Sequence, residues 1–215
     1  MFFFINIQTA CMQRQLQRRP NRERTETTRA ALIGAARDIF VERGYAETAT
    51  PDIVAAAGVT RGALYHHFAD KQALFRAVVE QEAAAVAAEI ERAAPETLSP
   101  LEALLAGGDA YLEAMQEPGR TRLLLLDGPA VLGRKEMDEI DNRHGNRTLR
   151  EGLLAAMRSR TIVKTPIEPL TALVAAAFDR AALAIESGAD LQSFRTAMHT
   201  LIQGLQNRHA DDDRG

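Results

Sequence analysis

Polar and aromatic side chains share one face of a short segment in the first third of the sequence. Arg61, Tyr65 and His66 fall on this face, whereas Leu64 and Phe68 fall on the opposite side. Residues three and four positions apart lie together on a helix, so the pattern predicts a short helix with a buried apolar side and an exposed polar side. Guanidinium, phenol and imidazole groups can hydrogen-bond to phosphates and base edges, which indicates nucleic-acid binding.

The residues just upstream place this segment in a helix-turn-helix. Thr50 and Pro51 suit the start of a helix, because threonine can cap it and proline lacks only an N–H that the first turn leaves unpaired. Gly58 can adopt the left-handed conformation that ends many helices, and Thr60 is a candidate N-cap for the next one. A short helix, a glycine-containing turn and a second short helix form the unit whose second helix enters the DNA major groove.

Helices on either side are expected to support this unit. Residues 26–43 carry apolar side chains at three- and four-residue steps, which predicts a helix that packs beneath the turn and ends at Gly44. A longer helix is expected from Lys71 to about Ala93, with Asp70 as its cap. This helix begins in the DNA-binding core and continues into the second half of the chain, so it links the two halves mechanically.

The composition favours an all-α protein. Tryptophan is absent and aromatic residues make up only 5% of the chain, which favours helices over sheets. Residues 1–79 hold 11 Lys and Arg against 7 Asp and Glu, whereas residues 80–215 hold 15 against 22. A basic front half and an acidic back half fit a nucleic-acid-binding module joined to a part that does not touch phosphates.

Cysteine usage and hydropathy indicate a protein of the reducing cytoplasm. Cys11 is the only cysteine, which excludes an intrachain disulfide and a thiolate metal cluster. The apolar start of the sequence is too short to span a bilayer, and no later stretch has the length of a transmembrane helix. We therefore expect a cytoplasmic protein without membrane association.

Residues 1–23 are expected to form a flexible N-terminal extension. From Met12 onward the segment is polar and rich in arginine. A basic arm of this kind can add phosphate or minor-groove contacts, although a solvated tail would have the same composition. We also hypothesise that Met12, rather than Met1, is the start of the protein.

The second half of the sequence predicts a bundle of helices. Asp127, Gly128 and Pro129 indicate a turn between two of them. The last two helices combine an alanine-rich helix with one that carries an apolar seam, so they form either a self-association surface or part of the monomer core. The helical patterns cover residues 100–116, 135–159, 166–187 and 190–207.

Catalytic motifs are missing from the sequence. The five histidines show no metal-ligand spacing, and the sequence holds no phosphate-binding glycine loop, nucleophile elbow or metalloprotease motif. We expect no enzymatic activity, no cofactor and no metal.

Four residues of the second half are candidates for binding a small molecule. His144 falls on the inward side of its helix, where it contacts a ligand or serves as a hydrogen-bonded structural histidine. Tyr111, Met115 and Phe178 are bulky inward groups that line a pocket or belong to the core. An interior rich in alanine and leucine would favour a largely apolar ligand.

The stretch from Thr50 to Lys71, TPDIVAAAGVTRGALYHHFADK, resembles the TetR family of bacterial transcriptional regulators. The helix before it, which ends FVERGY, and the order of the later helices agree with that family. The resemblance implies an all-α fold with a three-helix DNA-binding head and a larger helical body. It also implies that the body binds a small molecule and dimerises through its last two helices, and that the ligand moves the linking helix.

The resemblance assigns phosphate contacts around the second helix. Thr48 and Thr50 match positions that contact phosphates near its start. Ala49 replaces the Ser or Thr often found there, so Thr50 is expected to carry the helix cap alone. Lys71 matches a lysine at the start of the fourth helix, where its ammonium and the helix N-terminus would both attract a phosphate.

The resemblance also divides the residues of the third helix between bases and backbone. Arg61 is the best candidate for a guanine contact, because its fork can reach O6 and N7 together. Gly62 provides clearance for DNA or is simply tolerated. Tyr65 and His67 match phosphate contacts, with partly buried packing residues as the alternative, and His66 faces the groove between them. The residues expected to meet base edges are Thr60, Arg61, Gly62 and Ala63.

The sequence therefore predicts a homodimeric transcriptional regulator, specifically a repressor that leaves a palindromic double-stranded DNA operator when a small, largely apolar effector binds. The expected domains are the extension over residues 1–23, the DNA-binding domain over 24–84 and the effector-binding and dimerisation domain over 85–215. The alternative is a helical small-molecule carrier or enzyme without DNA-binding activity.

Overall fold

The computed structural model of the protein describes the backbone of residues 5–207 and the side chains of residues 24–207. The chain divides into two compact units, Met1–Val78 and Val79–Gly215. Within the described residues the secondary structure is helical, apart from an isolated β-bridge between Ile162 and Gln206. The predicted all-α fold is confirmed.

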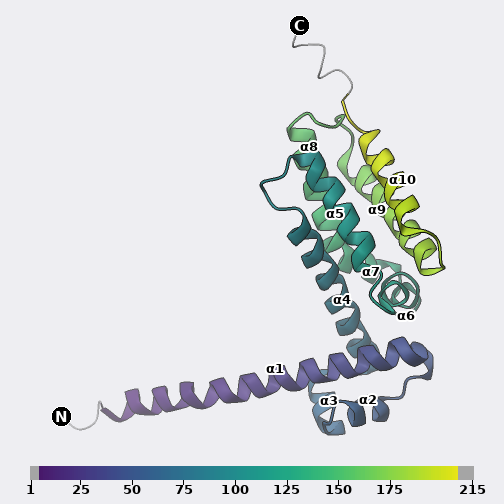
Figure 1. Cartoon of the computed structure of the whole chain (residues 1–215). Coiled ribbons are helices and arrows are strands. Elements are labelled where there is room, and N and C mark those ends of the chain that lie inside the picture. Colours follow the sequence, from purple (N-terminus) through teal and green to yellow (C-terminus); the bar gives the residue numbers. More distant parts are fainter. Residues whose placement is uncertain (1–4, 208–215) are drawn as a thin grey trace. The chain divides into compact units, whose positions relative to one another are not determined.

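Figure 1 shows the helices of the first unit. They pack around a small aromatic core. The rings of Phe40 and Phe75 meet edge to face with their centres 5.1 Å apart, and the ring of Tyr45 lies 5.0 Å from that of Phe75. Leu64 and Ile53 add side chains with no exposed surface. The helices of this unit are α1 (Ile5–Glu47), α2 (Thr50–Ala56), α3 (Arg61–His67) and the start of α4 (Lys71–Ala93).

The first helix begins upstream of the start that the sequence predicted. Its backbone is helical from Ile5 rather than from residue 26. The side chains of residues 1–23 lie outside the described residues, so the flexible extension and its basic arm stay predictions. Gly44 interrupts the helix where expected, with φ 80° and ψ 165°. Residues that carry a Cβ rarely adopt this conformation, which explains the glycine.

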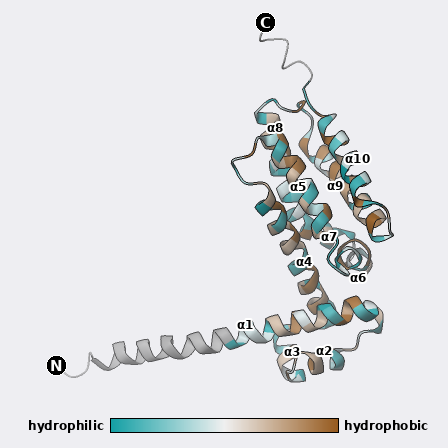
Figure 2. Ribbon diagram, in the orientation of Figure 1, coloured by the Kyte–Doolittle hydropathy of each residue, from teal (hydrophilic) through white to brown (hydrophobic). Residues whose placement is uncertain are grey.

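The second unit is a helical bundle whose core comes chiefly from α5, α8, α9 and α10. Figure 2 shows hydrophobic and hydrophilic residues interleaved along these helices, as amphipathic packing requires. The core side chains include Leu104, Leu112, Leu153, Leu170, Phe178, Met198 and Ile202. The elements after α4 are α5 (Pro100–Ala114), the π-helix η1 (Arg122–Asp127), α6 (Gly128–Leu132), α7 (Arg134–Arg143), α8 (Gly145–Arg158), α9 (Ile167–Glu186) and α10 (Leu191–Gln203).

The single helix predicted over residues 135–159 is two helices, because the chain breaks at His144. This residue has φ −123° and ψ −104°, outside the helical range. Its imidazole Nε2 lies 2.7 Å from Oε1 of Glu80, a partner 64 positions away in the sequence. Gly145 follows the break and is a poor helix former. The break at His144 therefore coincides with a long-range contact to Glu80 and with a low helix propensity at the next residue.

The turn predicted at Asp127 to Pro129 is helical instead. The π-helix η1 leads directly into α6, and Pro129 occupies the first turn of α6, where proline is tolerated. Gly128 is required by packing, since a Cβ there would lie 2.9 Å from the carbonyl oxygen of Leu123 and 2.9 Å from the sulfur of Met137. Close approach of other residues, rather than turn propensity, explains this glycine.

A buried ion pair ties α4 to the segment after α5 within the second unit. Arg120 is 7% exposed, and its Nε donates to Oε2 of Glu82 at 2.8 Å. Its Nη1 also donates to the carbonyl of Ala114 at 2.6 Å and to Glu89 at 3.2 Å. Because the charges are paired and the donors are used, removing either partner would leave a buried charge unsatisfied.

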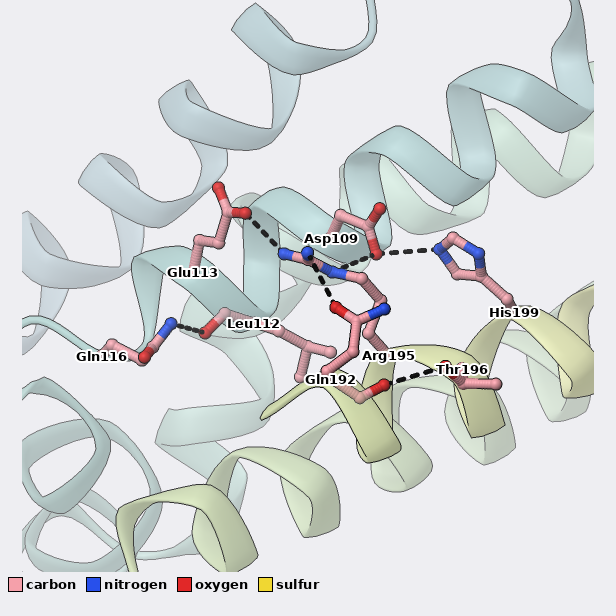
Figure 3. Close-up of polar contacts among 8 residues, drawn as sticks. All are labelled: Asp109, Leu112, Glu113, Gln116, Gln192, Arg195, Thr196 and His199. Carbon is pink, nitrogen blue, oxygen red and sulfur yellow. Dashed lines mark hydrogen bonds and ion pairs between the residues drawn. The ribbon is translucent and has the colours of Figure 1, made fainter. Parts of the chain in front are cut away.

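A second polar network joins α5 to α10 (Figure 3). Arg195 of α10 lies between two acids of α5, 3.1 Å from Asp109 and 2.5 Å from Glu113. His199, one turn further along α10, places Nε2 2.8 Å from the same oxygen of Asp109. These contacts fix the orientation of the last helix on the bundle.

Candidate nucleic-acid interface

The helix-turn-helix forms largely as its sequence predicts. Gly58 has φ +64°, the left-handed conformation expected at the end of α2. The hydroxyl of Thr60 accepts a hydrogen bond from the backbone N–H of Ala63 at 3.2 Å and so caps α3. Leu64 is fully buried and Phe68 is 5% exposed, which anchors the inner side of α3.

The cap predicted for α2 is wrong in one respect. Thr50 is the first helical residue rather than the cap, and Ala49 occupies the N-cap position without a side-chain hydrogen bond. A residue already inside the helix cannot place its hydroxyl over the free N–H groups of the first turn. The Thr50 hydroxyl is therefore not used for capping, and the side chain stays half-buried at the end of the helix.

The outer face of α3 presents the polar residues that the sequence singled out. Arg61, Gly62, Tyr65 and His66 are exposed, whereas Ala63 and His67 are half-buried. The guanidinium carbon of Arg61 lies 5.5 Å from the ring centre of Tyr65, one helical turn further on. Within residues 24–207 Arg61 forms no ion pair with a carboxylate. Its hydrogen-bond donors are thus free to meet an external acceptor.

His67 lies at the end of α3 in a basic and aromatic setting. Its ring centre is 5.3 Å from that of His66 and 6.3 Å from that of Phe68. Partial burial lowers the pKa of His67, and the neighbouring His66 and Arg29 lower it further. A neutral imidazole can donate a hydrogen bond to a phosphate but adds no full charge to the surface.

Lys71 has a structural role that the sequence did not reveal. Its Nζ donates to the main-chain carbonyls of Tyr45 at 2.8 Å and Thr48 at 2.9 Å. The same nitrogen lies 4.2 Å from the ring centre of Tyr45. An ammonium has three donors, so one donor is left for a phosphate while the other two tie the end of α1 to the start of α4.

Thr48 is the one predicted phosphate contact whose side chain faces inward. It is 2% exposed, and its hydroxyl donates to the carbonyl of Gly44 at 2.7 Å. A hydroxyl buried and engaged in this way cannot reach a phosphate on the surface. The prediction for this side chain is corrected: Thr48 closes the turn after α1.

Arg29 is a candidate contact that sequence reasoning missed. This exposed residue of α1 holds its guanidinium carbon 5.3 Å from the ring centre of Phe68, beside the end of α3. Its position 38 residues before His67 hides this proximity in the sequence. A basic side chain in the first turn of the helix predicted over residues 26–43 would have been the available signal.

The four candidate ligand residues of the second unit are only partly brought together. Tyr111 and Phe178 pack with ring centres 5.6 Å apart, and the Tyr111 hydroxyl donates to Oδ1 of Asp179 at 2.6 Å. Burial, reinforced by Asp179, raises the pKa of Tyr111 well above its usual value. Met115 is 2% exposed at the end of α5, and His144 contacts Glu80 instead.

Two family profiles match this chain. The profile described as bacterial regulatory proteins, tetR family, matches residues 32–78, and that described as tetracyclin repressor-like, C-terminal domain, matches residues 101–207. A crystal structure of a TetR-family transcriptional regulator from Pectobacterium atrosepticum is 34% identical in sequence. It covers 86% of this chain and 97% of its own, with a TM-score of 0.70.

The chain belongs to the TetR family. The HTH-type transcriptional regulator TtgR of Pseudomonas putida is 45% identical over 62 residues, which are 29% of this chain and 30% of TtgR. The chain thus spans about a third of the length of such curated relatives. The TetR-like regulator LfrR from Mycobacterium smegmatis, in complex with proflavine, shares the fold at 24% identity with a TM-score of 0.59, over 82% of this chain and 94% of its own. None of the helices in residues 5–207 has the length and apolarity needed to cross a membrane.

Proposed function

We propose that this TetR-family protein is a transcriptional regulator that reads double-stranded DNA with the outer face of α3. The exposed row of Arg61, Tyr65 and His66 on a helix capped by Thr60 carries the proposal. Such a helix fits the major groove, where an arginine can bind guanine and neighbouring groups can bind phosphates. Thr50, His67 and Lys71 flank this row and are proposed phosphate contacts, and Gly62 and Ala63 border the bases.

Binding to a fluorescent duplex tests this function directly. The duplex carries the DNA upstream of the protein's own gene, and a shuffled duplex of the same composition is the control. We expect tighter binding to the first duplex and an affinity that falls steeply between 50 and 200 mM salt, as about six to ten phosphate contacts would require. Salt-insensitive binding, or no binding to any duplex, would favour a small-molecule carrier or an enzyme.

The protein is proposed to act as a homodimer through α9 and α10. Leu173 of α9 is 71% exposed and Leu201 of α10 is 58% exposed, so each of the two helices carries a large apolar side chain on its surface. Ala172, Ala176 and Ala197 accompany them on the exposed faces of the two helices and would allow close helix approach. A twofold dimer implies a palindromic operator, with recognition helices about 34 Å apart or a multiple of that distance.

Regulation is proposed to come from a small-molecule effector held in the second unit. The packed rings of Tyr111 and Phe178 offer an aromatic wall, and Met115 contributes a further apolar group on the same helix as Tyr111. A largely apolar effector would suit this wall, and LfrR, which shares the fold, was solved in complex with a small molecule, proflavine. We propose that effector binding releases the protein from its DNA operator, so that the protein acts as a repressor. Its proposed location is the cytoplasm, where the operator would lie.

A further inference from the structure

The aromatic ring of Tyr65 lies where it can restrict the movement of Arg61. The two side chains are four positions apart on the exposed face of α3, and the guanidinium carbon is 5.5 Å from the ring centre. Tyr65 is 44% exposed, so its ring lies over the helix surface rather than in the core. A guanidinium within about 6 Å of a tyrosine ring is attracted by the negative face of the ring.

Within the described residues, the contact recorded for the Arg61 guanidinium is the one with the Tyr65 ring. A Cβ placed on the next residue, Gly62, would meet only the Thr60 hydroxyl oxygen, at 3.9 Å, so the helix surface at residue 62 is open. Among residues 24–207 no carboxylate pairs with Arg61. An arginine held in this way keeps its hydrogen-bond donors available but samples fewer rotamers than a free one. Less conformational freedom is then lost when its donors align with a base.

We infer that Tyr65 is a positioning residue that orients Arg61 for base recognition, in addition to any contact of its own hydroxyl with a phosphate. This inference rests on the proposed DNA-binding function. It predicts that sequence discrimination at the base read by Arg61 depends on the aromatic ring of Tyr65 and not on its hydroxyl. If Tyr65 served only as a phosphate contact, neither loss of the ring nor loss of the hydroxyl would change discrimination at that base, because phosphates carry no sequence information.

Three variants separate the two roles. Tyr65→Phe keeps the ring and removes the hydroxyl, Tyr65→Leu removes both, and Arg61→Ala removes the group to be positioned. Affinities are measured for the operator and for operators substituted at each base. The base read by Arg61 is the one at which Arg61→Ala no longer discriminates, and circular dichroism confirms that each variant is folded.

We expect Tyr65→Phe to weaken binding to all duplexes alike while the discrimination ratio at that base is unchanged. Tyr65→Leu should lower the ratio about two- to fivefold, the range of an exposed cation–π contact. In the Arg61→Ala background Tyr65→Leu should change the ratio no further. The positioning role would be overturned if Tyr65→Phe and Tyr65→Leu had equal discrimination ratios. It would also be overturned if Tyr65→Leu lowered the ratio as much in the Arg61→Ala background as in the wild type.

A measurement without DNA distinguishes this inference from the proposed function. In the free protein the Tyr65 ring should shift the NMR signals of the Arg61 δ-protons upfield, and Tyr65→Leu should abolish that shift. An absent shift would refute the positioning role even if the protein binds its operator. If the upfield shift is present but the protein binds no duplex specifically, the proposed function is refuted, and with it the role of Arg61 in base recognition.

Discussion

The ammonium of Lys71 binds the residue Tyr45 in two ways at once. It donates a hydrogen bond to the main-chain carbonyl of Tyr45 at 2.8 Å and lies 4.2 Å from the centre of its ring. A second bond, to the carbonyl of Thr48, completes the contact. The side chain of Lys71 therefore ties the connection between α1 and α2 to the start of α4. The same side chain is a proposed phosphate contact.

Lys71→Ala should destabilise the first unit and weaken DNA binding. Hydrogen bonds to a charged group contribute about 1.5–3 kcal/mol, so we expect a loss of about 1–2 kcal/mol in unfolding free energy at this half-buried site. Binding should weaken for all sequences alike, with the salt slope reduced by about 1. Urea unfolding and binding titrations measure the two effects. Lys164→Ala, at an exposed lysine of the second unit, is the control; equal stability of both variants would contradict the structural role.

Arg61→Ala should reduce sequence-specific binding more than non-specific binding. An arginine that binds guanine in the major groove contributes about 1–3 kcal/mol of discrimination. We expect the variant to tolerate substitution at one base of each half-site, measured by binding to a set of single-base operator variants. Arg61→Lys keeps the charge without the fork and should recover the salt dependence but not the full specificity. An equal loss on specific and random DNA would refute the assigned role.

Gly62→Ala tests whether this glycine exists for the DNA rather than for the protein. The fold leaves room for a Cβ at residue 62, so alanine should stabilise α3 by up to about 1 kcal/mol. If the backbone must approach DNA closely, operator affinity should nevertheless fall. Gly34→Ala is a matched control, because a Cβ at residue 34 meets nothing within 4 Å and one at residue 62 meets only the Thr60 hydroxyl oxygen, at 3.9 Å. Unfolding and binding are measured for both variants, and unchanged affinity for Gly62→Ala would show that the glycine is merely tolerated.

Asp141 should make stability depend on pH. Burial, and then the nearby acids Asp179 and Asp138, raise the pKa of Asp141 from 3.8 to about 7. The folded state therefore binds this proton more tightly than the unfolded state, and the unfolding free energy falls as the pH rises from about 4 to about 7.

Asp141→Asn should remove this loss. We expect the variant to gain about 1–2 kcal/mol relative to the wild type at pH 8, after allowance for solvent screening, and little at pH 4. Thermal unfolding across this range measures the difference. Glu186→Gln makes the same change of charge at an exposed residue and serves as the control. A gain that is constant with pH would show that ionisation of Asp141 is not its source.

Leu201→Glu should convert the proposed dimer into a monomer. A charge placed on an apolar interface must be buried without a partner, which strongly disfavours association. Leu126→Glu is the matched control, because Leu126 is similarly exposed, at 52% against 58%, but belongs to η1 rather than to α9 or α10. Light scattering after size-exclusion chromatography gives the mass of each variant. If the mass were unchanged for Leu201→Glu and halved for Leu126→Glu, the dimer interface would include η1 instead of the proposed surface of α9 and α10.

Local sequence signals predicted much of the fold. Asp70 and Ser99 cap α4 and α5 by bonding to N–H groups three residues ahead, as Thr60 does for α3. These caps, the glycine at residue 58 and the apolar spacing of each helix act over a few residues. Their effects can therefore be read directly from the sequence. The spacing of Leu64 and Phe68 indicated which face of α3 would be buried, and the resemblance to the TetR family then divided its other residues between base and phosphate contacts.

Only the tertiary structure decided which polar side chains form hydrogen bonds or ion pairs within the protein. Lys71 finds its carbonyl partners 26 and 23 residues upstream, Arg120 finds Glu82 38 residues upstream, and Glu80 meets His144 64 residues downstream. Such pairs depend on how helices pack, and no local pattern encodes them. The sequence thus determined the helices, the turn and the exposed reading face. Packing assigned Thr48 to the interior, split the helix at His144 and placed the ring of Tyr65 beside Arg61, because these outcomes depend on the geometry of the folded chain.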